Sequence, residues 1–218
     1  MEPRLSPIGA RILGALIEKE MTTPDYYPLT LNALLTACNQ KSNREPVMSL
    51  DEESILPDLD ALRERRFVFQ VRTAGSRTAK YEHNLGAIAD FSPREAAVLC
   101  VLLLRGPQTP GEIRNRTTRL YAFNGLSEVE RALAELAEKP DGPFVRKLPR
   151  HAGHKEHRYA EELSDSPVPE ETSEPVSATP ADAPSSDRLA SLEETVSVLQ
   201  SDLEELRAEF ERFRSQFE

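Results

Sequence analysis

Three of the four histidines in this chain are regularly spaced, at His151, His154 and His157. Neutral imidazoles are good metal ligands, so the cluster is the first candidate for a metal site. Residues three apart on a strand lie on alternating faces, and no cysteine or carboxylate completes a set of recognised zinc spacing. We therefore expect no metal and no cofactor, and interpret the segment as one that gains positive charge at low pH. Whether the histidines bind anything stays open.

The sequence contains no catalytic motif. It has no glycine-rich phosphate loop, no serine or cysteine nucleophile beside a histidine, and no carboxylate pair in an apolar setting. Most acidic residues fall on amphipathic segments, where they are expected to form solvated faces. The sequence therefore predicts a protein that is not an enzyme.

Basic and amide side chains indicate a different chemistry, namely contact with phosphate groups. They gather in a loop at positions 39–44 and in two hairpins whose turns contain Gly75 and Gly153. Amides can bond to phosphates or base edges, and Lys and Arg supply charge. The candidate nucleic-acid-binding residues are Asn39, Lys41, Asn43, Arg44, Arg77, Lys80, Lys155 and Arg158.

A repeat predicts the elements that would position these residues. Ser6-Pro7 recurs 86 positions later as Ser92-Pro93, Thr23-Pro24 recurs as Thr109-Pro110, and Lys19 recurs as Arg105. Each unit is predicted to contain three helices followed by a basic two-stranded hairpin, which is the order of elements in a winged helix-turn-helix. We predict a mainly α fold with small β-wings, in two tandem winged-helix domains at residues 1–88 and 89–163.

Local signals place the helices. In the first unit we expect helices at about 7–20, 30–39 and 51–66, with a kink or a broken first turn at Pro57. In the second unit, Ser92, Thr109 and Ser127 each precede a glutamate by three positions and predict three capping boxes. The third helices carry acids such as Glu52 and Glu53, which repel phosphate, so we expect wings and loop to make the backbone contacts.

The rest of the chain is predicted to be a linker and a coiled coil. Residues 164–187 are rich in proline and acid and read as a disordered linker. In residues 188–218 apolar positions alternate steps of three and four, which predicts a parallel dimeric coil, with a single helix docked on its own domain as the alternative. The predicted oligomerisation residues are Leu189, Leu192, Val196, Leu199, Leu203, Leu206, Phe210 and Phe213.

Charge and composition limit the classes of partner that the chain can bind. The net charge of -10 resides in residues 164–218, which carry 4 Lys+Arg against 14 Asp+Glu. The remainder is neutral overall, so local basic patches can still bind an anion. Without a signal peptide or a membrane-spanning run, we expect a soluble cytoplasmic protein with no membrane partner. Cys38 and Cys100 are expected to be reduced core thiols.

A long motif identifies a family resemblance. Residues 22–34 (TTPDYYPLTLNAL) and 37–47 (ACNQKSNREPV) closely resemble the YceH-like family of bacterial proteins of unknown function. The resemblance covers residues 1–163 and implies two tandem winged-helix domains, often with a C-terminal helical tail. It implies no established activity, cofactor or catalytic residue. The motif also contains ten residues that the second unit lacks, and a lengthened loop often carries function.

Two functions are consistent with these patterns. The first is a DNA-associated protein that holds duplex DNA through its wings and the 39–44 loop and dimerises through its tail. The second is a protein-protein interaction adaptor that binds no nucleic acid and uses the acidic third helices as recognition surfaces. A winged helix serves both uses, so the fold alone does not choose between them.

Overall fold

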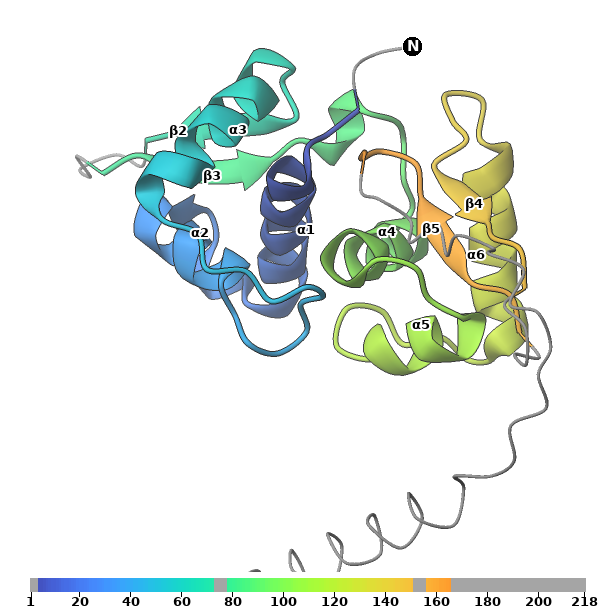
Figure 1. The fold of residues 1–218 in the computed structure, drawn as a ribbon. Helices are drawn as coiled ribbons and strands as arrows, with labels where there is room; N and C mark the ends of the chain where they lie inside the picture. The colour runs from blue at the N-terminus through green and yellow to red at the C-terminus, as the bar shows by residue number, and fades with distance from the viewer. Residues whose placement is uncertain (1–3, 73–77, 151–155, 166–218) are drawn as a thin grey trace, which may run out of the picture. The chain divides into compact units, whose positions relative to one another are not determined.

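The first repeat contains three α-helices and a three-stranded antiparallel sheet (Figure 1). The computed structural model describes residues 4–72, 78–150 and 156–165. The sheet has the order β1-β3-β2, and β1 pairs Leu29 with Tyr81. The elements are α1 (Pro7–Thr22), a 3-10 turn (Pro24–Tyr26), β1 (Leu29–Thr30), α2 (Leu31–Cys38), α3 (Glu52–Glu64), β2 (Val68–Val71), β3 (Lys80–His83) and a second 3-10 turn (Leu85–Ala87).

The second repeat has the same order of elements. Its segments are α4 (Pro93–Arg105), α5 (Pro110–Arg116), α6 (Leu126–Glu138), β4 (Val145–Lys147) and β5 (Tyr159–Glu161). An isolated bridge joins Gln108, just before α5, to Tyr159 of β5, as β1 before α2 joins β3. The prediction of a mainly α fold with small antiparallel sheets is therefore confirmed.

Side-chain caps explain where most of these helices begin. Ser6 accepts from the Gly9 amide, and the capping boxes at Ser92 and Thr109 are present as predicted. The box predicted at Ser127 is wrong, because α6 begins at Leu126, two residues earlier than that box implies, with Gly125 as its cap. The Glu128 carboxylate instead accepts from the backbone amide of Asn124, which draws the preceding turn onto the helix.

Helix α3 runs through Pro57 without interruption, so a broken first turn is wrong. Asp51 and Ser54 form a reciprocal capping box that secures the first turn. Pro57 removes one hydrogen bond, to the carbonyl of Glu53, and Glu53 is exposed so that water can satisfy the carbonyl. The helix buries Ile55, Leu59 and Leu62 against the first-repeat core.

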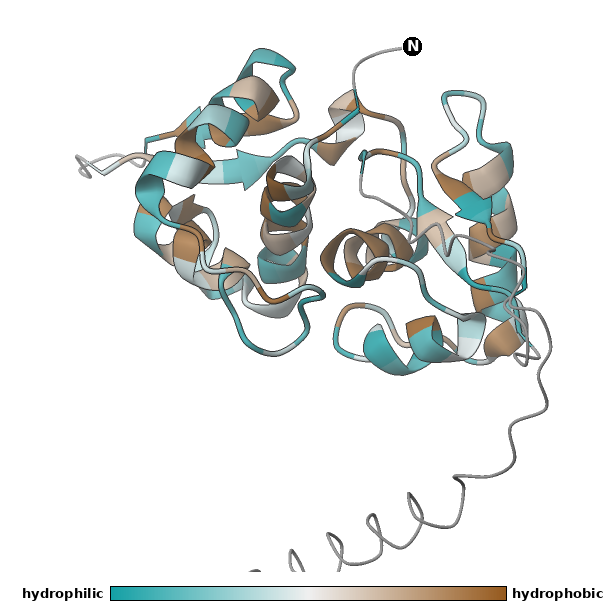
Figure 2. Ribbon diagram, in the orientation of Figure 1, coloured by the Kyte–Doolittle hydropathy of each residue, from teal (hydrophilic) through white to brown (hydrophobic). Residues whose placement is uncertain are grey.

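The first helices of the two repeats pack against each other. Leu103 and Leu104 of α4 belong to the same apolar cluster as Leu13 and Leu16 of α1. Gly14 allows this close approach, since a Cβ atom there would lie 3.0 Å from Leu104 side-chain atoms. Figure 2 shows most of α4 as hydrophobic, as expected for a helix buried on several sides.

None of the helices in the described part of the chain has the length and apolar character needed to cross a lipid bilayer.

Candidate functional site

Asn39 closes the loop of residues 39–51 between α2 and α3, which we call the long loop of the first repeat. Its side-chain oxygen accepts from the Leu50 amide at 2.8 Å, and its amide nitrogen donates to the Leu50 carbonyl at 2.7 Å. The pair of bonds closes a loop of ten intervening residues after α2. Both functional groups of this amide thus make bonds inside the protein and hold the loop closed, while the predicted phosphate contact of Asn39 stays a prediction.

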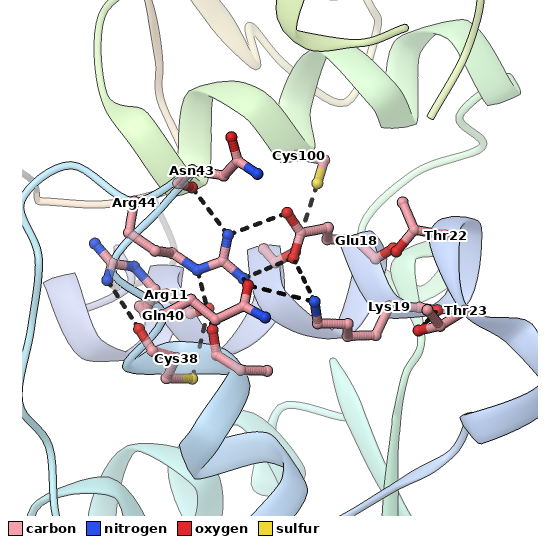
Figure 3. Close-up of polar contacts among 12 residues, drawn as sticks. Arg11, Glu18, Lys19, Thr22, Thr23, Cys38, Gln40, Asn43, Arg44 and Cys100 are labelled. Carbon is pink, nitrogen blue, oxygen red and sulfur yellow. Dashed lines mark hydrogen bonds and ion pairs between the residues drawn. The ribbon is translucent and has the colours of Figure 1, made fainter. Parts of the chain in front are cut away.

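Arg44 lies inside the protein, which corrects its predicted role as a surface charge. Its side chain is 0% exposed. The guanidinium donates to both carboxylate oxygens of Glu18, at 3.1 and 2.6 Å, and to the carbonyl of Ala37 at 3.0 Å (Figure 3). Further bonds go to the Asn43 carbonyl and the Gln40 side chain. Because its donors are engaged here, Arg44 is not available to a phosphate at the surface.

A second buried arginine lies beside this pair. Arg11 donates to the carbonyls of Cys38 at 3.1 Å and Pro46 at 2.7 Å, while its Nε atom is buried without a partner among the described residues. Burial and the nearby Arg44 charge lower the pKa of Arg11. Arg11 and Arg44 therefore hold the long loop to α1 from the inside, as Figure 3 shows.

Glu18 balances the buried charge. Burial alone would raise the pKa of Glu18, but the hydrogen bond and charge of Arg44, helped by Lys19, hold that pKa below its usual range. Lys19 lies 3.2 Å from the carboxylate and 3.3 Å from the Gln40 side-chain oxygen. The carboxylate is thus ionised and shared between two cations.

The two cysteines are buried, as predicted. Each is 0% exposed and neither forms a disulfide. Burial raises the pKa of the Cys38 thiol to about 12 and also raises the pKa of Cys100. A thiol with such a pKa carries almost no thiolate at neutral pH, so neither cysteine is suited to be a nucleophile.

Two other predicted loop residues reach the surface. Lys41 and Asn43 are exposed, and Asn43 has a backbone φ of 61°. The Asn43 side-chain oxygen accepts from the guanidinium of Arg105 at the end of α4, and the Glu45 amide donates to the Leu104 carbonyl at 2.9 Å. The long loop of the first repeat is therefore bonded to the first helix of the second.

The predicted wing residues are dispersed. Lys80 lies partly exposed on β3, whereas Arg158 forms an ion pair with Glu112 at 2.9 Å and also donates to the Pro107 carbonyl. Arg77 and Lys155 lie outside the described residues. No hydrogen bond or ion pair among the described residues joins Lys80 or Arg158 to the 39–44 loop.

The histidine cluster is described only at His157, since His151 and His154 lie outside the described residues. The Nε2 atom of His157 accepts from Arg150 Nε at 2.9 Å, and Nδ1 lies 3.0 Å from the Leu148 carbonyl. This pattern fits a neutral imidazole protonated at Nδ1. In the described part of the chain no three His, Cys, Asp or Glu residues come together as a metal site.

A cavity of about 380 Å³ lies where the long loop meets the second repeat. It is bounded by the C-terminal ends of α1 and α4, by the loop residues Gln40, Ser42 and Asn43, and by the end of α5 with the turn that follows it. We call it the junction cavity. The cationic residues that line it are Lys19, Arg105, Arg116 and Arg119.

The sequence prediction did not include this cavity, although the repeat carries a signal for it. Lys19 and Arg105 occupy equivalent positions of the repeat, each near the end of a first helix. Since α1 packs on α4, the two cations line the same cavity. Arg116 is the last residue of α5 and Arg119 follows that helix, and no periodic pattern in the sequence indicated either of them.

The predicted oligomerisation residues, from Leu189 to Phe213, lie outside the described residues. The linker predicted for 164–187 is described only at Ser164 and Asp165. Ser164 forms a parallel bridge with Leu5, and the Asp165 amide donates to the Leu5 carbonyl at 2.9 Å. The start of that segment is therefore attached to the N-terminal end of the described chain.

Residues 5–154 match a family described as a protein of unknown function, DUF480. A UPF0502 protein of Vibrio parahaemolyticus is 48% identical over 213 residues, covering 96% of this chain and 97% of the relative. A UPF0502 protein of Geobacter sulfurreducens is 47% identical over 221 residues, covering 100% of both chains. These names state no activity. On this full-length similarity, and in agreement with the motif at 22–47, the chain belongs to the DUF480 (UPF0502) family of bacterial proteins.

Proposed function

We propose that this chain is a non-enzymatic tandem winged-helix protein that associates with the phosphate backbone of duplex DNA and dimerises through residues 188–218. The order of elements supports the first part. In each repeat, three helices precede an antiparallel hairpin, and the segment before the second helix pairs with the last strand of the hairpin. This is the arrangement of winged-helix domains, many of which bind DNA.

The observation that carries the DNA proposal is the placement of exposed cations. Arg114 on α5, Lys147 on β4 and Arg150 just after β4 are exposed, and none has a carboxylate partner among the described residues. Cations without a carboxylate partner can replace condensed counterions on DNA. They lie outside the third helices, as expected for backbone contact in place of base reading.

The charges of the third helices also favour backbone contact over base reading. Glu52 and Glu53 are exposed in the first turn of α3, and Glu130 is exposed on α6. Carboxylates at these places repel phosphate, so the third helices are poorly suited to enter a major groove. Binding is therefore expected to depend on salt and only weakly on DNA sequence.

The test is a titration of the full chain with a fluorescent DNA duplex at several salt concentrations. Reversing Arg114, Lys147 and Arg150 to Glu should weaken binding on all sequences and lower the salt slope by about 0.9 for each phosphate that is no longer neutralised. Arg131→Glu is the control for each of the three single reversals, because Arg131 is exposed on α6 and the substitution makes the same charge change as one of them. Failure to bind at low salt would contradict the proposal, as would an equal effect of the control.

One observation favours the adaptor alternative. Leu56 of α3 is 38% exposed on a helix whose surface also carries Glu52, Glu53 and Asp60. An apolar residue rimmed by charge is a feature of protein-binding surfaces. If no DNA is bound, Leu56→Asp should abolish the capture of a protein partner that the intact chain retains, and Leu56→Met should preserve it.

A further inference from the structure

We propose that the junction cavity binds a small phosphate-bearing anion, independently of any association with DNA. The cavity has a buried part, where the lining residues Cys100 and Leu104 are 0% and 3% exposed, and an open rim that includes the exposed residues Ser42 and Arg119. Its volume of about 380 Å³ falls at the small end of the range of ligand pockets. A small anion fits such a space.

The positive charge of the cavity lining favours an anion as the ligand. Four cations line it, and the lining carboxylate, Glu18, already has both oxygens bonded to Arg44. Arg116 lies 3.8 Å from Glu112, but Glu112 is more closely paired with Arg158 at 2.9 Å. No ion pair among the described residues involves Arg105 or Arg119. The lining is therefore left with excess positive charge.

Arg105 shows the consequence of this excess. Burial lowers its pKa, and the charges of Arg116 and Arg44 lower it further, while Glu18 and Glu45 act in the opposite direction. Such repulsion among cations disfavours the empty cavity and is relieved when an anion enters. Arginine is also suited to phosphate, because its planar fork donates two parallel hydrogen bonds.

Neutral donors complete the site. The Ser42 hydroxyl and the Asn115 amide line the cavity and make none of the side-chain hydrogen bonds found among the described residues. Asn43 uses its oxygen to accept from Arg105, which leaves its amide nitrogen free to donate. Hydroxyl and amide donors of this kind fix the orientation of a phosphate group whose charge the arginines neutralise.

Both repeats build the cavity, and the buried network holds the loop side of it. Arg44 bonds the loop to α1, and the Glu45 amide bonds the loop to α4. The loop donors are thus positioned before any ligand arrives, which lowers the entropy lost on binding. Gln40, Ser42 and Asn43 of the longer loop therefore contribute to a binding site as well as to packing.

The experiment measures binding of pyrophosphate and inorganic phosphate to the full chain by calorimetry and by thermal unfolding, at constant ionic strength. We expect saturable binding of pyrophosphate and a rise in Tm. The variant Arg105→Gln/Arg116→Gln should weaken pyrophosphate binding at least about tenfold. The control Arg114→Gln/Arg131→Gln makes the same charge change at exposed positions outside the cavity lining and should bind as the unaltered chain does.

Three results would overturn the proposal. The first is an absence of saturable binding to the unaltered chain. The second is a rise in Tm that the Arg105→Gln/Arg116→Gln variant retains, which would be a general salt effect. Because Arg105→Gln also removes the hydrogen bond to Asn43, Arg116→Gln/Arg119→Gln serves as a second cavity variant and should show the same weakening.

The third result separates the cavity from DNA binding. A short duplex that competes with pyrophosphate, and whose binding falls in the same cavity variants, would assign the cavity to the nucleic-acid backbone. The DNA proposal depends on Arg114, Lys147 and Arg150, which do not line the cavity. Each proposal can therefore fail while the other holds.

Discussion

The Arg44→Met variant tests whether the long loop is held from the inside. The side chain is 0% exposed and makes five hydrogen bonds, two of them to the carboxylate of Glu18. Removing one partner of a buried ion pair costs about 3–5 kcal/mol because the other charge is left uncompensated. Lys19 remains 3.2 Å from Glu18, so we expect a loss near the lower figure, about 3 kcal/mol.

Urea unfolding followed by circular dichroism measures this loss. A domain with a stability of about 5–15 kcal/mol remains folded after it, so the variant can be studied. Protein concentration is kept constant, because self-association through the tail would make stability depend on concentration. Lys41→Met is the matched control, since it removes an exposed cation from the same loop and should change stability by less than about 0.5 kcal/mol.

A double-mutant cycle with Glu18→Gln identifies the source of the loss. If the two residues act through their mutual contact, the double variant should lose less than the sum of the single losses, by about 1–3 kcal/mol. Equal effects of Arg44→Met and Lys41→Met would refute the buried role of Arg44. Such a result would return Arg44 to the surface and to the candidate phosphate contacts.

Three further predictions concern pH, thiols and assembly. The pKa of Glu18 is held below its ordinary value of 4.5, so its contribution to stability is present above that pH and is lost as pH falls through the lower folded-state pKa. Acid unfolding of Glu18→Gln should therefore show a shallower loss below pH 4.5, and an unchanged profile would contradict the assignment. Cys38 and Cys100 should react with a thiol reagent only after unfolding, because both are buried; rapid labelling of the native chain would argue against this. Light scattering should give a dimer for the full chain and a monomer for a truncation after Asp165, which preserves the Leu5 contacts; equal masses would exclude dimerisation by the tail.

Sequence reasoning identified the features that depend on neighbouring residues. The caps at Ser6, Ser92 and Thr109 were predictable because each uses bonds within one helical turn. The repeat predicted the order of helices and hairpins, and the apolar spacing around Cys38 predicted its burial. Strand β1 was not predicted, since two residues are too few to produce an alternating pattern.

The role of Arg44 depended on a distant residue. In the sequence it stands among Lys41, Ser42 and Asn43, a polar setting that indicates a solvated loop. Its burial results from the pairing with Glu18, which lies 26 positions earlier on α1. No sequence pattern connects these two residues. Similarly, α6 begins at Leu126 because the Glu128 carboxylate accepts hydrogen bonds from the Asn124 amide and the Tyr121 hydroxyl. This start competes with a capping box at Ser127, and local helix propensity does not distinguish the two starts.

The insertion in the first repeat explains why the two halves differ in chemistry although they share an architecture. In the second repeat, Arg116 ends α5, and Arg119 lies in the shorter segment that connects α5 to α6. In the first repeat, the longer loop crosses to α4, where the Glu45 amide bonds to Leu104 and Asn43 bonds to Arg105. The buried Arg44 keeps that loop in place at the cost of a desolvated charge, which Glu18 offsets. A ligand in the junction cavity would therefore contact both repeats at once, and its binding free energy would stabilise their packing.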